Sequence, residues 1–417
     1  MSIPVKHRTW ADFHVEVAQN HRRRHLSWPS RQVLTDLAFC HQPTIVRSTV
    51  TGELYSHGAE GRNDRPCALV WHSTDRGRSW SQLCRSPLLA PPMPPGARRS
   101  FCTYDGIGTT DRDTLLVSCR RHWDGRANGV DAVWQSDPTS RDQAWVIRSG
   151  DRGQTWERSA ELDSGDYLNV GSDVARFCLL ENGKLLLAQC AMPWSHTDDR
   201  RPDPPWRGEA YLFESRDDGR TWQRIGTMGL DTCECDLLEL PSKRILATTR
   251  YQRKRIDGDP PDMVSNEWLE VMEGLHPGFP TEPEGYCFYK QTAVLHSDDG
   301  GRTWSTPRLV TGWLQQTACL VRLSDGTIVL PFSHKNDGHG QRFIISYDEG
   351  ETWSNSIFEL NGFGLYASSV ALDDDTIVTV TETPRWHKPV QFHVLRWSVP
   401  PRKAVEEQGF FTPRPVS

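Results

Sequence analysis

The sequence predicts an all-β protein folded as a six-bladed β-propeller with Asp-box repeats. Two periodic features support this prediction: an octapeptide that returns five times and a pair of short strands that returns six times. The composition agrees with it, because 32 glycines and 28 prolines among 417 residues are typical of a chain with many turns. Short β-units stacked radially form a propeller, in which each four-stranded blade buries its faces against its neighbours.

The octapeptide has the pattern S-x-D-x-G-x-[ST]-W, and each copy is called a box below. The five boxes are STDRGRSW at 73–80, SGDRGQTW at 149–156, SRDDGRTW at 215–222, SDDGGRTW at 297–304 and SYDEGETW at 346–353. Each box follows a β-rich run, which predicts a hairpin turn. In such a turn the Asp accepts bonds from backbone N–H groups, the Gly adopts a positive φ and the Trp packs over the hairpin. We therefore expect the boxes at the rim, away from the central funnel.

The second periodic element is a pair of short strands joined at a polar turn. Its six copies span 44–55, 102–117, 177–187, 237–247, 319–330 and 369–379. Each copy except the last precedes a box, so counting the copies gives six blades. We expect the whole chain, 1–417, to form one propeller domain.

Three segments fall outside the period. Residues 1–40 have strand-like patches, and we expect them to supply the outer strand that closes the ring with the final strand, at 390–397. Two insertions, at about 122–141 and 252–288, are rich in Gly, Pro and charged residues. Loops of this length in a compact domain are typically functional.

Composition excludes several classes of protein. The formal net charge of −6 argues against a nucleic-acid partner held by phosphate contacts. The first thirty residues have no apolar core and no later run reaches membrane-spanning length, so we expect neither signal peptide nor membrane contact, and a cytoplasmic location. Eleven cysteines, an odd number, predict reduced thiols. The lone C-x-C pair of Cys233 and Cys235 lacks further metal ligands, so neither metal nor cofactor is expected.

The repeats resemble those of the sialidases (exo-α-neuraminidases), which are six-bladed propellers carrying the same Asp boxes. Because such boxes also occur in propellers with other functions, the resemblance in activity rests on polar residues at the ends of the inner strands. Glu234 opens the first strand of the fourth unit and Arg250 ends the second, 16 residues later. The family places a catalytic Glu and a carboxylate-binding Arg in this relation.

The sixth unit extends the resemblance. Tyr366 opens its first strand and Glu382 ends its second, again 16 residues later, which resembles the family's nucleophilic Tyr and the Glu that braces an arginine. Asp64 precedes the first box as the family's acid/base Asp does, and Arg342 would match the remaining clamp arginine. The resemblance implies a glycoside hydrolase that removes sialic acid or a related ulosonic acid from acidic glycans, with Tyr366 and Glu234 as a nucleophile and base pair.

The chemistry of such a substrate explains these residue types. A nonulosonic sugar carries a carboxylate on its anomeric carbon, which repels a carboxylate nucleophile. A tyrosine is neutral until it attacks, and a neighbouring Glu can take its proton as the new bond forms. Arginines bind the substrate carboxylate bidentately and never lose their charge.

One position departs from the family pattern. Sialidases open the first blade with an R-I-P segment, but residues 40–43 read CHQP, so His41 takes the place of the arginine. An imidazole cannot bind a carboxylate bidentately, so either Arg62 substitutes or the substrate is not ordinary sialic acid. His41 could instead be the acid or base of a propeller polysaccharide lyase or hydrolase acting on uronate-containing glycans. A third interpretation of the sequence is a catalytically inactive propeller that binds glycans.

Overall fold

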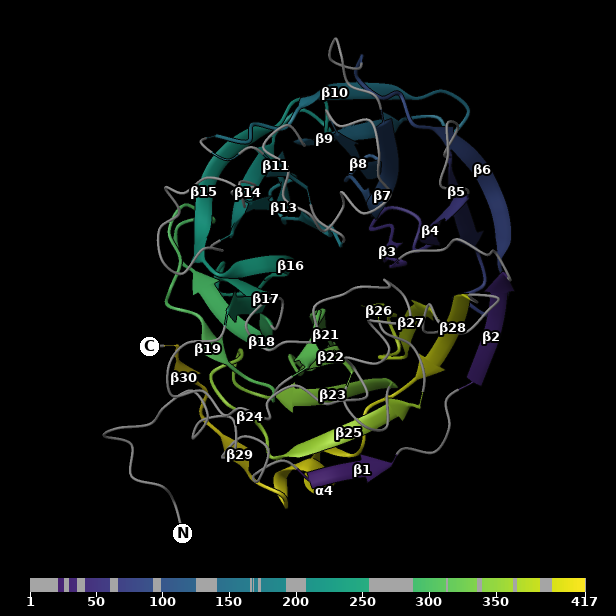
Figure 1. Ribbon diagram of the computed structural model, residues 1–417. Helices are drawn as coiled ribbons and strands as arrows, with labels where there is room; N and C mark the ends of the chain where they lie inside the picture. The colour runs from purple at the N-terminus through teal and green to yellow at the C-terminus, as the bar shows by residue number, and fades with distance from the viewer. Residues whose placement is uncertain are drawn as a thin grey trace, which may run out of the picture.

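Six β-sheets surround a central axis in a computed structural model of the chain (Figure 1). The structure describes residues 22–25, 30–35, 42–60, 67–92, 99–124, 141–165, 167, 169–171, 174–192, 208–254, 288–312, 314–335, 340–362, 366–382 and 392–416. These residues form strands throughout, apart from one short helix and the connecting turns. The predicted six-bladed β-propeller is therefore confirmed.

The first three blades follow the order of the chain, each with its first strand innermost. Blade 1 consists of β3 (Ile45–Arg47), β4 (Leu54–Glu60), β5 (Cys67–Ser73) and β6 (Ser81–Pro87). Blade 2 consists of β7 (Arg99–Thr109), β8 (Leu115–Asp124), β9 (Arg141–Ser149) and β10 (Glu157–Glu161). Blade 3 consists of β11 (Asn169–Val170), β12 (Phe177–Leu179), β13 (Leu185–Met192), β14 (Glu209–Ser215) and β15 (Gln223–Leu230).

The other three blades also recruit strands from the two ends of the chain. Blade 4 consists of β16 (Thr232–Glu239), β17 (Ile245–Lys254), β18 (Phe288–Ser297), β19 (Arg308–Leu309) and β30 (Arg414–Pro415). Blade 5 consists of β20 (Gln315–Gln316), β21 (Val321–Arg322), β22 (Ile328–His334), β23 (Gly340–Ser346), β25 (Ser356–Asn361) and β1 (Arg22–His25). Blade 6 consists of β26 (Ala367–Ala371), β27 (Ile377–Glu382), β28 (Phe392–Trp397) and β2 (Ser30–Thr35).

The ring closes by pairing the beginning of the chain with its end. Strand β2 pairs antiparallel with β28, with Ser30 opposite Arg396, and it forms the outer strand of blade 6. Strand β1 was not anticipated, and it adds parallel to the outer strand β25 of blade 5. After blade 6 the chain forms α4 (Arg402–Glu406), pairs β29 (Phe410–Phe411) with β24 (Trp353–Ser354) and ends against β19.

Apolar side chains fill each of the six interfaces between neighbouring blades in the described part of the chain. Successive side chains of a strand point to opposite faces of the sheet, so one strand contributes apolar side chains to the interfaces on both sides of its blade. In β13, Leu187 packs with blade 2 while Leu186 packs with blade 4. The backbones also come close: a Cβ atom on Gly106 would lie 1.6 Å from the carbonyl oxygen of Ala175. Blades 2 and 3 therefore touch without an intervening side chain.

The five boxes form the hairpin turns that the sequence predicts. In every box the Asp accepts a hydrogen bond from the hydroxyl of the Ser or Thr before the Trp, at 2.6 Å. The opening Ser accepts the N–H of the Gly, and the Trp indole donates to the carbonyl of that Gly. The Gly residues have φ values of 76° to 91°. These self-contained bonds make the turn a rigid unit.

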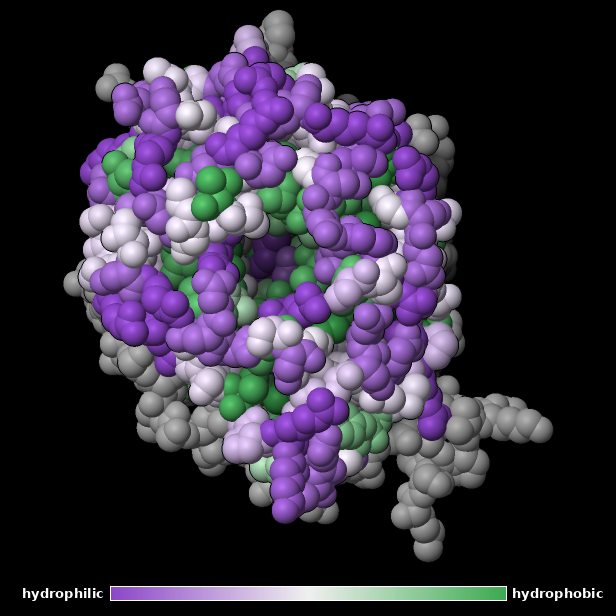
Figure 2. Space-filling model, turned by 180° about the vertical axis from the view of Figure 1, so that it is seen from behind, coloured by the Kyte–Doolittle hydropathy of each residue, from purple (hydrophilic) through white to green (hydrophobic). Residues whose placement is uncertain are grey.

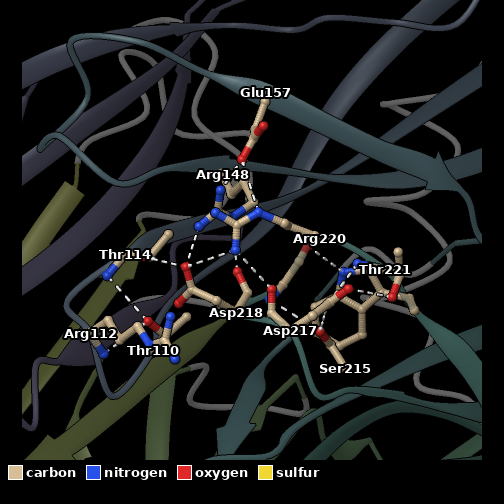
Figure 3. A network of polar contacts seen from close by, with 12 residues as sticks. Thr110, Arg112, Thr114, Arg148, Glu157, Ser215, Asp217, Asp218, Arg220 and Thr221 are labelled. Carbon is tan, nitrogen blue, oxygen red and sulfur yellow. Dashed lines mark hydrogen bonds and ion pairs between the residues drawn. The ribbon is translucent and has the colours of Figure 1, made fainter.

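Four of the five boxes also contact the preceding blade through the residue before the box Gly, and the exception is the fourth box, which has Gly300 there. In the third box this residue is Asp218, which accepts hydrogen bonds from Arg148 and from the Thr114 hydroxyl, at 2.9 Å for Thr114 (Figure 3). The Arg148 guanidinium is shared with Glu157 of its own blade. In the first box, Arg76 forms an ion pair with Asp374 of blade 6 at 2.6 Å. The boxes therefore fasten neighbouring blades as well as turning the chain.

The face seen in Figure 2 is largely hydrophilic and is hollowed at its centre. Three large apolar side chains of the described residues are exposed, and they belong to Val50, Leu89 and Leu230. The helical part of the described chain contains no segment with the length and apolar character needed to cross a bilayer. The cysteines that the structure describes are free thiols.

The bonds within the boxes predict acid sensitivity. Hydrogen bonds from the hydroxyl and N–H of Thr303 lower the pKa of Asp299 to about 2. Since the pKa is depressed in the folded state, the stabilisation is present above about pH 4 and is lost as the pH falls toward 2. Asp299→Asn should lower the thermal midpoint by roughly 2 °C at pH 7, and this difference should shrink in acid.

Asp111, which is exposed on the turn between β7 and β8, is the matched control. Thermal unfolding of Asp111→Asn, followed by circular dichroism from pH 7 to pH 2.5, should track that of the parent protein. An Asp299→Asn protein with the parent's midpoint at pH 7 would contradict the stabilising role of the box.

Candidate functional site

The predicted residues of blade 4 lie at the end of the blade opposite to its box. Ile245 pairs with Ser297, the first residue of the box, whereas Arg250 lies further along β17. Cys233 pairs with Arg250, so β16 begins at this same end. The innermost strands of the blades converge around the axis here, and the residues that open them face one another.

Blade 6 repeats this arrangement, and hairpin register explains the 16-residue spacing. Ala367 pairs with Thr381, so the next position on each strand brings Tyr366 opposite Glu382. The Thr381 hydroxyl donates to the carbonyl oxygen of Tyr366 at 2.6 Å. The sequence spacing therefore identified a pair of neighbours in space.

Glu234 and Arg250 form an ion pair in the structure. Both are buried, with 2% and 8% of their surface exposed. The other carboxylate oxygen of Glu234 accepts the hydroxyl of Thr317 from blade 5 at 2.5 Å. Within the described residues, the polar partners of this carboxylate are thus Arg250 and Thr317, so its position is fixed from two blades.

The backbone of Glu234 is strained. Strand β16 has an irregularity in its pairing between Cys233 and Asp236, and Glu234 within it has a φ of 47°. Residues other than Gly rarely adopt this conformation, and such outliers cluster at active sites. The N–H of Glu234 donates to the sulfur of Cys190 in blade 3 at 3.2 Å. The bulge turns the carboxylate toward Arg250 and is held there by the neighbouring blade.

Two thiols adjoin the Arg250 guanidinium. The Nε of Arg250 donates to the sulfur of Cys233 at 3.2 Å. Burial opposes ionisation of Cys233, but the hydrogen bond with Cys190 and the charge of Arg250 lower the pKa of this thiol. Burial alone would lower the pKa of Arg250, yet the charges of Cys233, Glu234 and Tyr366 raise it well above the ordinary value. Arg250 therefore stays cationic at every physiological pH.

Tyr366 lies beside a second cation, Lys335. The tyrosine is 7% exposed and its ring packs against Val174 of blade 3. The Nζ of Lys335 lies 3.4 Å from the Tyr366 hydroxyl oxygen and 4.5 Å from the ring centroid. The backbone N–H of Lys335 donates to the carbonyl of Leu314 at 3.0 Å, which holds the end of β22 in place. Lys335 therefore brings a positive charge close to the tyrosine oxygen.

Sequence reasoning missed Lys335, because the spacing of the repeats points to its neighbourhood and not to the residue itself. Arg250 in blade 4 and Glu382 in blade 6 each lie six residues after the carbonyl that closes the first hairpin of their blade. The same count gives Ser333 in blade 5, and Lys335 lies two residues further, on the same side of an extended chain. In blade 2 the count gives Arg120, whose Nε lies 3.7 Å from a carboxylate oxygen of Asp105.

Glu382 is fully buried and is linked to the start of blade 1. One of its carboxylate oxygens accepts the backbone N–H of Gln42 at 2.9 Å. Gln42 follows His41 in the chain and has a φ of 52°. The bond fixes Gln42, whereas His41, at which the sequence departs from the sialidase pattern, lies outside the described residues.

The sequence resemblance implied a clamp role for Arg342, whose described contacts lie within its own blade. Its Nη1 donates to the backbone carbonyls of Gln341 and Asn361, at 3.1 and 3.0 Å, and its Nη2 lies 3.8 Å from Glu359. These contacts are within blade 5, between β23 and β25. Arg342 lies in the third strand of this blade, whereas Lys335 lies at the end of the second. The role of Arg342 as a clamp arginine stays a prediction.

Several sequence-based assignments fall on residues that the structure does not describe. They are Asp64, Arg62 and His41, together with most of the insertions at 122–141 and 252–288. Their positions in the sequence, before the first box and between second and third strands, remain the basis for their predicted roles. No group of three or more His, Cys, Asp or Glu side chains suited to a metal ion occurs in the described portion of the chain.

Arg176, from blade 3, reaches across the axis at the floor of the site. Its guanidinium donates to the carbonyl oxygens of Ala367 and Ala318, at 2.7 and 3.1 Å, and to the hydroxyl of Ser368 at 3.4 Å. Its charge also acts on the buried Asp236 of blade 4, whose pKa burial raises and Arg176 counteracts. One side chain thus connects blades 3, 4, 5 and 6.

The partners of Arg176 adjoin the site residues in sequence. Ala367 follows Tyr366, and Ala318 follows Thr317, the hydroxyl donor to Glu234. Arg176 therefore fixes the backbone beneath both the tyrosine and the partner of the glutamate. This positioning role had no signal in the sequence, because the bonds are made to backbone carbonyls.

The chain resembles known sialidases in sequence over part of its length. No protein-family model matches it. Sialidases of two Vibrio cholerae O1 strains are 23% identical over 198 residues, which is 40% of this chain and 22% of theirs. The chain thus spans only about a fifth of the length of these curated relatives.

Solved structures show the same fold over most of the chain. A Dyadobacter fermentans protein of unknown function matches with a TM-score of 0.58 and 15% identity, over 88% of this chain and 99% of its own. The Hadza microbial sialidase Hz136 matches with a TM-score of 0.54 and 18% identity, over 89% and 67%. Trypanosoma rangeli sialidase matches with a TM-score of 0.52 and 15% identity, over 87% and 55%. The chain is a sialidase-like six-bladed propeller.

The contacts of Arg176 predict a large loss of stability on its removal. Arg176→Met should cost about 3–5 kcal/mol in the free energy of unfolding, since the carbonyl oxygens of Ala367 and Ala318 lose a charged hydrogen-bond donor and Asp236 loses a nearby positive charge. Adding Asp236→Asn to Arg176→Met should recover part of the loss. Urea unfolding followed by tryptophan fluorescence measures both. A single variant within about 1 kcal/mol of the parent would rule out the linking role of Arg176.

Proposed function

We propose that the protein is a glycoside hydrolase that removes an acidic terminal sugar, sialic acid or a related ulosonic acid, from glycans. The observation that carries this proposal is the Tyr366 hydroxyl, which lies beside Lys335 and close to the charge of Arg250 where the blades converge. The fold supports it, because it is that of sialidases. Among these, Trypanosoma rangeli sialidase has been solved with sialic acid and with the inhibitor DANA.

The proposed reaction has two displacement steps. In the first, the Tyr366 oxygen bonds to the anomeric carbon and its proton passes to Glu234, while the glycosidic C–O bond breaks and the leaving oxygen takes a proton from Asp64. In the second, Asp64 removes a proton from water, the water oxygen replaces Tyr366 on the anomeric carbon, and the tyrosine recovers its proton from Glu234. The nucleophile is thus regenerated with no change in oxidation state.

The Glu234–Arg250 ion pair links substrate binding to the proton transfer in this reaction. In the free protein the Arg250 guanidinium is bound to Glu234. A substrate carboxylate competes for the same guanidinium, because its planar fork suits bidentate binding. Binding would then weaken the bond to Glu234 and leave a carboxylate oxygen able to accept the Tyr366 proton. We further propose that Glu382 braces the start of blade 1, where His41 and Arg62 contribute to substrate recognition.

A substrate screen tests the proposed function. Purified protein is incubated with aryl glycosides of sialic, deaminated sialic, ulosonic and uronic acids, and aryl release and ultraviolet absorption of unsaturated sugar are both recorded. Release of the aryl group from a sialic or ulosonic acid, with no unsaturated product, is expected. Unsaturated product from a uronate substrate would instead establish a lyase. Binding without turnover would establish a glycan-binding propeller.

Replacing Tyr366 by Phe should remove the nucleophile. Turnover of the best substrate should fall by about a hundredfold or more, because one hydroxyl carries the covalent step. The thermal midpoint should change little, since the ring keeps its packing against Val174. Tyr347→Phe is the matched control, because Tyr347 lies in a box and packs against Phe410. Nearly intact turnover in Tyr366→Phe would show that the tyrosine mechanism is wrong.

Restoring an arginine at position 41 should improve sialoside binding. A charge-assisted bond to a buried carboxylate contributes about 1.5–3 kcal/mol, so its absence costs at least about tenfold in affinity. Ordinary sialosides should thus be poor substrates of the natural protein, and His41→Arg should lower KM for them. Kinetics on a common sialoside measure this. Strong native activity that His41→Arg abolishes would refute a changed substrate preference.

A further inference from the structure

The end of β22 brings an ammonium group to the oxygen on which the proposed chemistry depends. Lys335 reaches Tyr366 across a blade interface, from blade 5 to the first strand of blade 6. Its Nζ lies 3.4 Å from the hydroxyl oxygen and 4.5 Å from the ring centroid. The ring attracts the ammonium through its electron-rich face, which directs the charge to the tyrosine and not to bulk solvent.

We propose that Lys335 is a catalytic residue whose ammonium stabilises the developing phenolate of Tyr366 during nucleophilic attack. The proposal rests on the proposed function, in which the Tyr366 proton passes to Glu234 as the oxygen bonds to the anomeric carbon. Negative charge builds on the tyrosine oxygen before the new bond is complete, and again as the bond breaks in the second step. The attraction between a preorganised cation and that oxygen is stronger in the transition state than in the ground state, because the oxygen carries more negative charge there.

Among the described residues, two other charged groups act on Tyr366, and neither offers a cation that is held by the tyrosine alone. Arg250 acts on the tyrosine, but its guanidinium is bound to Glu234 in the free protein and to the substrate carboxylate in the proposed complex. Glu382 lies opposite Tyr366 by register and has one oxygen bound to the N–H of Gln42. Its negative charge opposes formation of a phenolate, so a compensating cation is required.

The contacts of other side chains near Lys335 and Tyr366 agree with a role for Lys335 in stabilising the phenolate. His334, the preceding residue, has its Nδ1 3.2 Å from the Nε2 of Gln315, within its own blade. Val174, which packs with the tyrosine ring, is apolar and buried, so it excludes water from its contact with the ring. A point charge in a poorly solvated position acts more strongly than one in water. Lysine also differs from arginine in being a compact ammonium with a single charge centre.

Direct titration of the tyrosine tests the pairing without any substrate. The ultraviolet signal of tyrosine ionisation is recorded for the full chain and for Tyr366→Phe, and the difference gives Tyr366 alone. Lys335→Met should move this titration upward by about one pH unit, because the stabilising cation is lost. Lys335→Arg should keep it near the parent position. Lys403→Met, on the exposed face of α4, is the matched control and should change nothing.

Kinetics then test the catalytic role. Lys335→Met should lower kcat by about tenfold or more with little change in KM, and Lys335→Arg should recover part of the loss. An unchanged titration, an unchanged kcat, or a raised KM with normal kcat would each overturn the proposal. If the parent protein cleaves no acidic glycoside, the proposed function fails, whereas the titration still decides whether Lys335 stabilises the phenolate.

Discussion

Apolar contact between facing blades is the constraint on which the rest of the structure depends. A sheet of four to six short strands has two faces to bury, and each blade does so by presenting alternate side chains to its two neighbours. In β13, adjacent leucines serve opposite interfaces. This requirement fixes the radial stacking and sets the distance between the innermost strands. The site exists because these strands begin close together around one axis.

The convergence of the innermost strands explains why the charged side chains of the site are buried and paired with one another. A charge near the axis is surrounded by blades, so it needs a partner from its own hairpin or from a neighbour. Glu234 is paired with Arg250 of the same blade and with Thr317 of the next. Lys335 and Tyr366 meet across another interface. The interfaces on either side of blade 5 therefore stabilise the ring and also position a functional contact each, so fold and site cannot vary independently.

Features with a local sequence code could be predicted, and features that depend on distant contacts could not. The boxes were predictable because each completes its hydrogen bonds within eight residues. Hairpin register likewise relates Tyr366 to Glu382 through sequence spacing. Arg342 and Lys335 differ in strand position, which spacing alone does not reveal. Arg176 bonds to backbone carbonyls of other blades, and β1 pairs in parallel with a strand far along the chain, so neither has a signature in its own neighbourhood.

The pairing of β2 with β28 determines the order in which the molecule can assemble. Residues 30–35 find their partner at 392–397, so the last interface cannot form until the final blade has been synthesised. During translation, one apolar face of blade 1 stays exposed until blade 6 has folded against it. Blade 6 in turn lacks its outer strand until residues 30–35 pair with β28. Contacts between such distant residues slow folding and leave strand edges exposed to other chains. Closing the ring in this way therefore slows folding, but it holds β2 and β28, from near the two ends of the chain, together in one sheet.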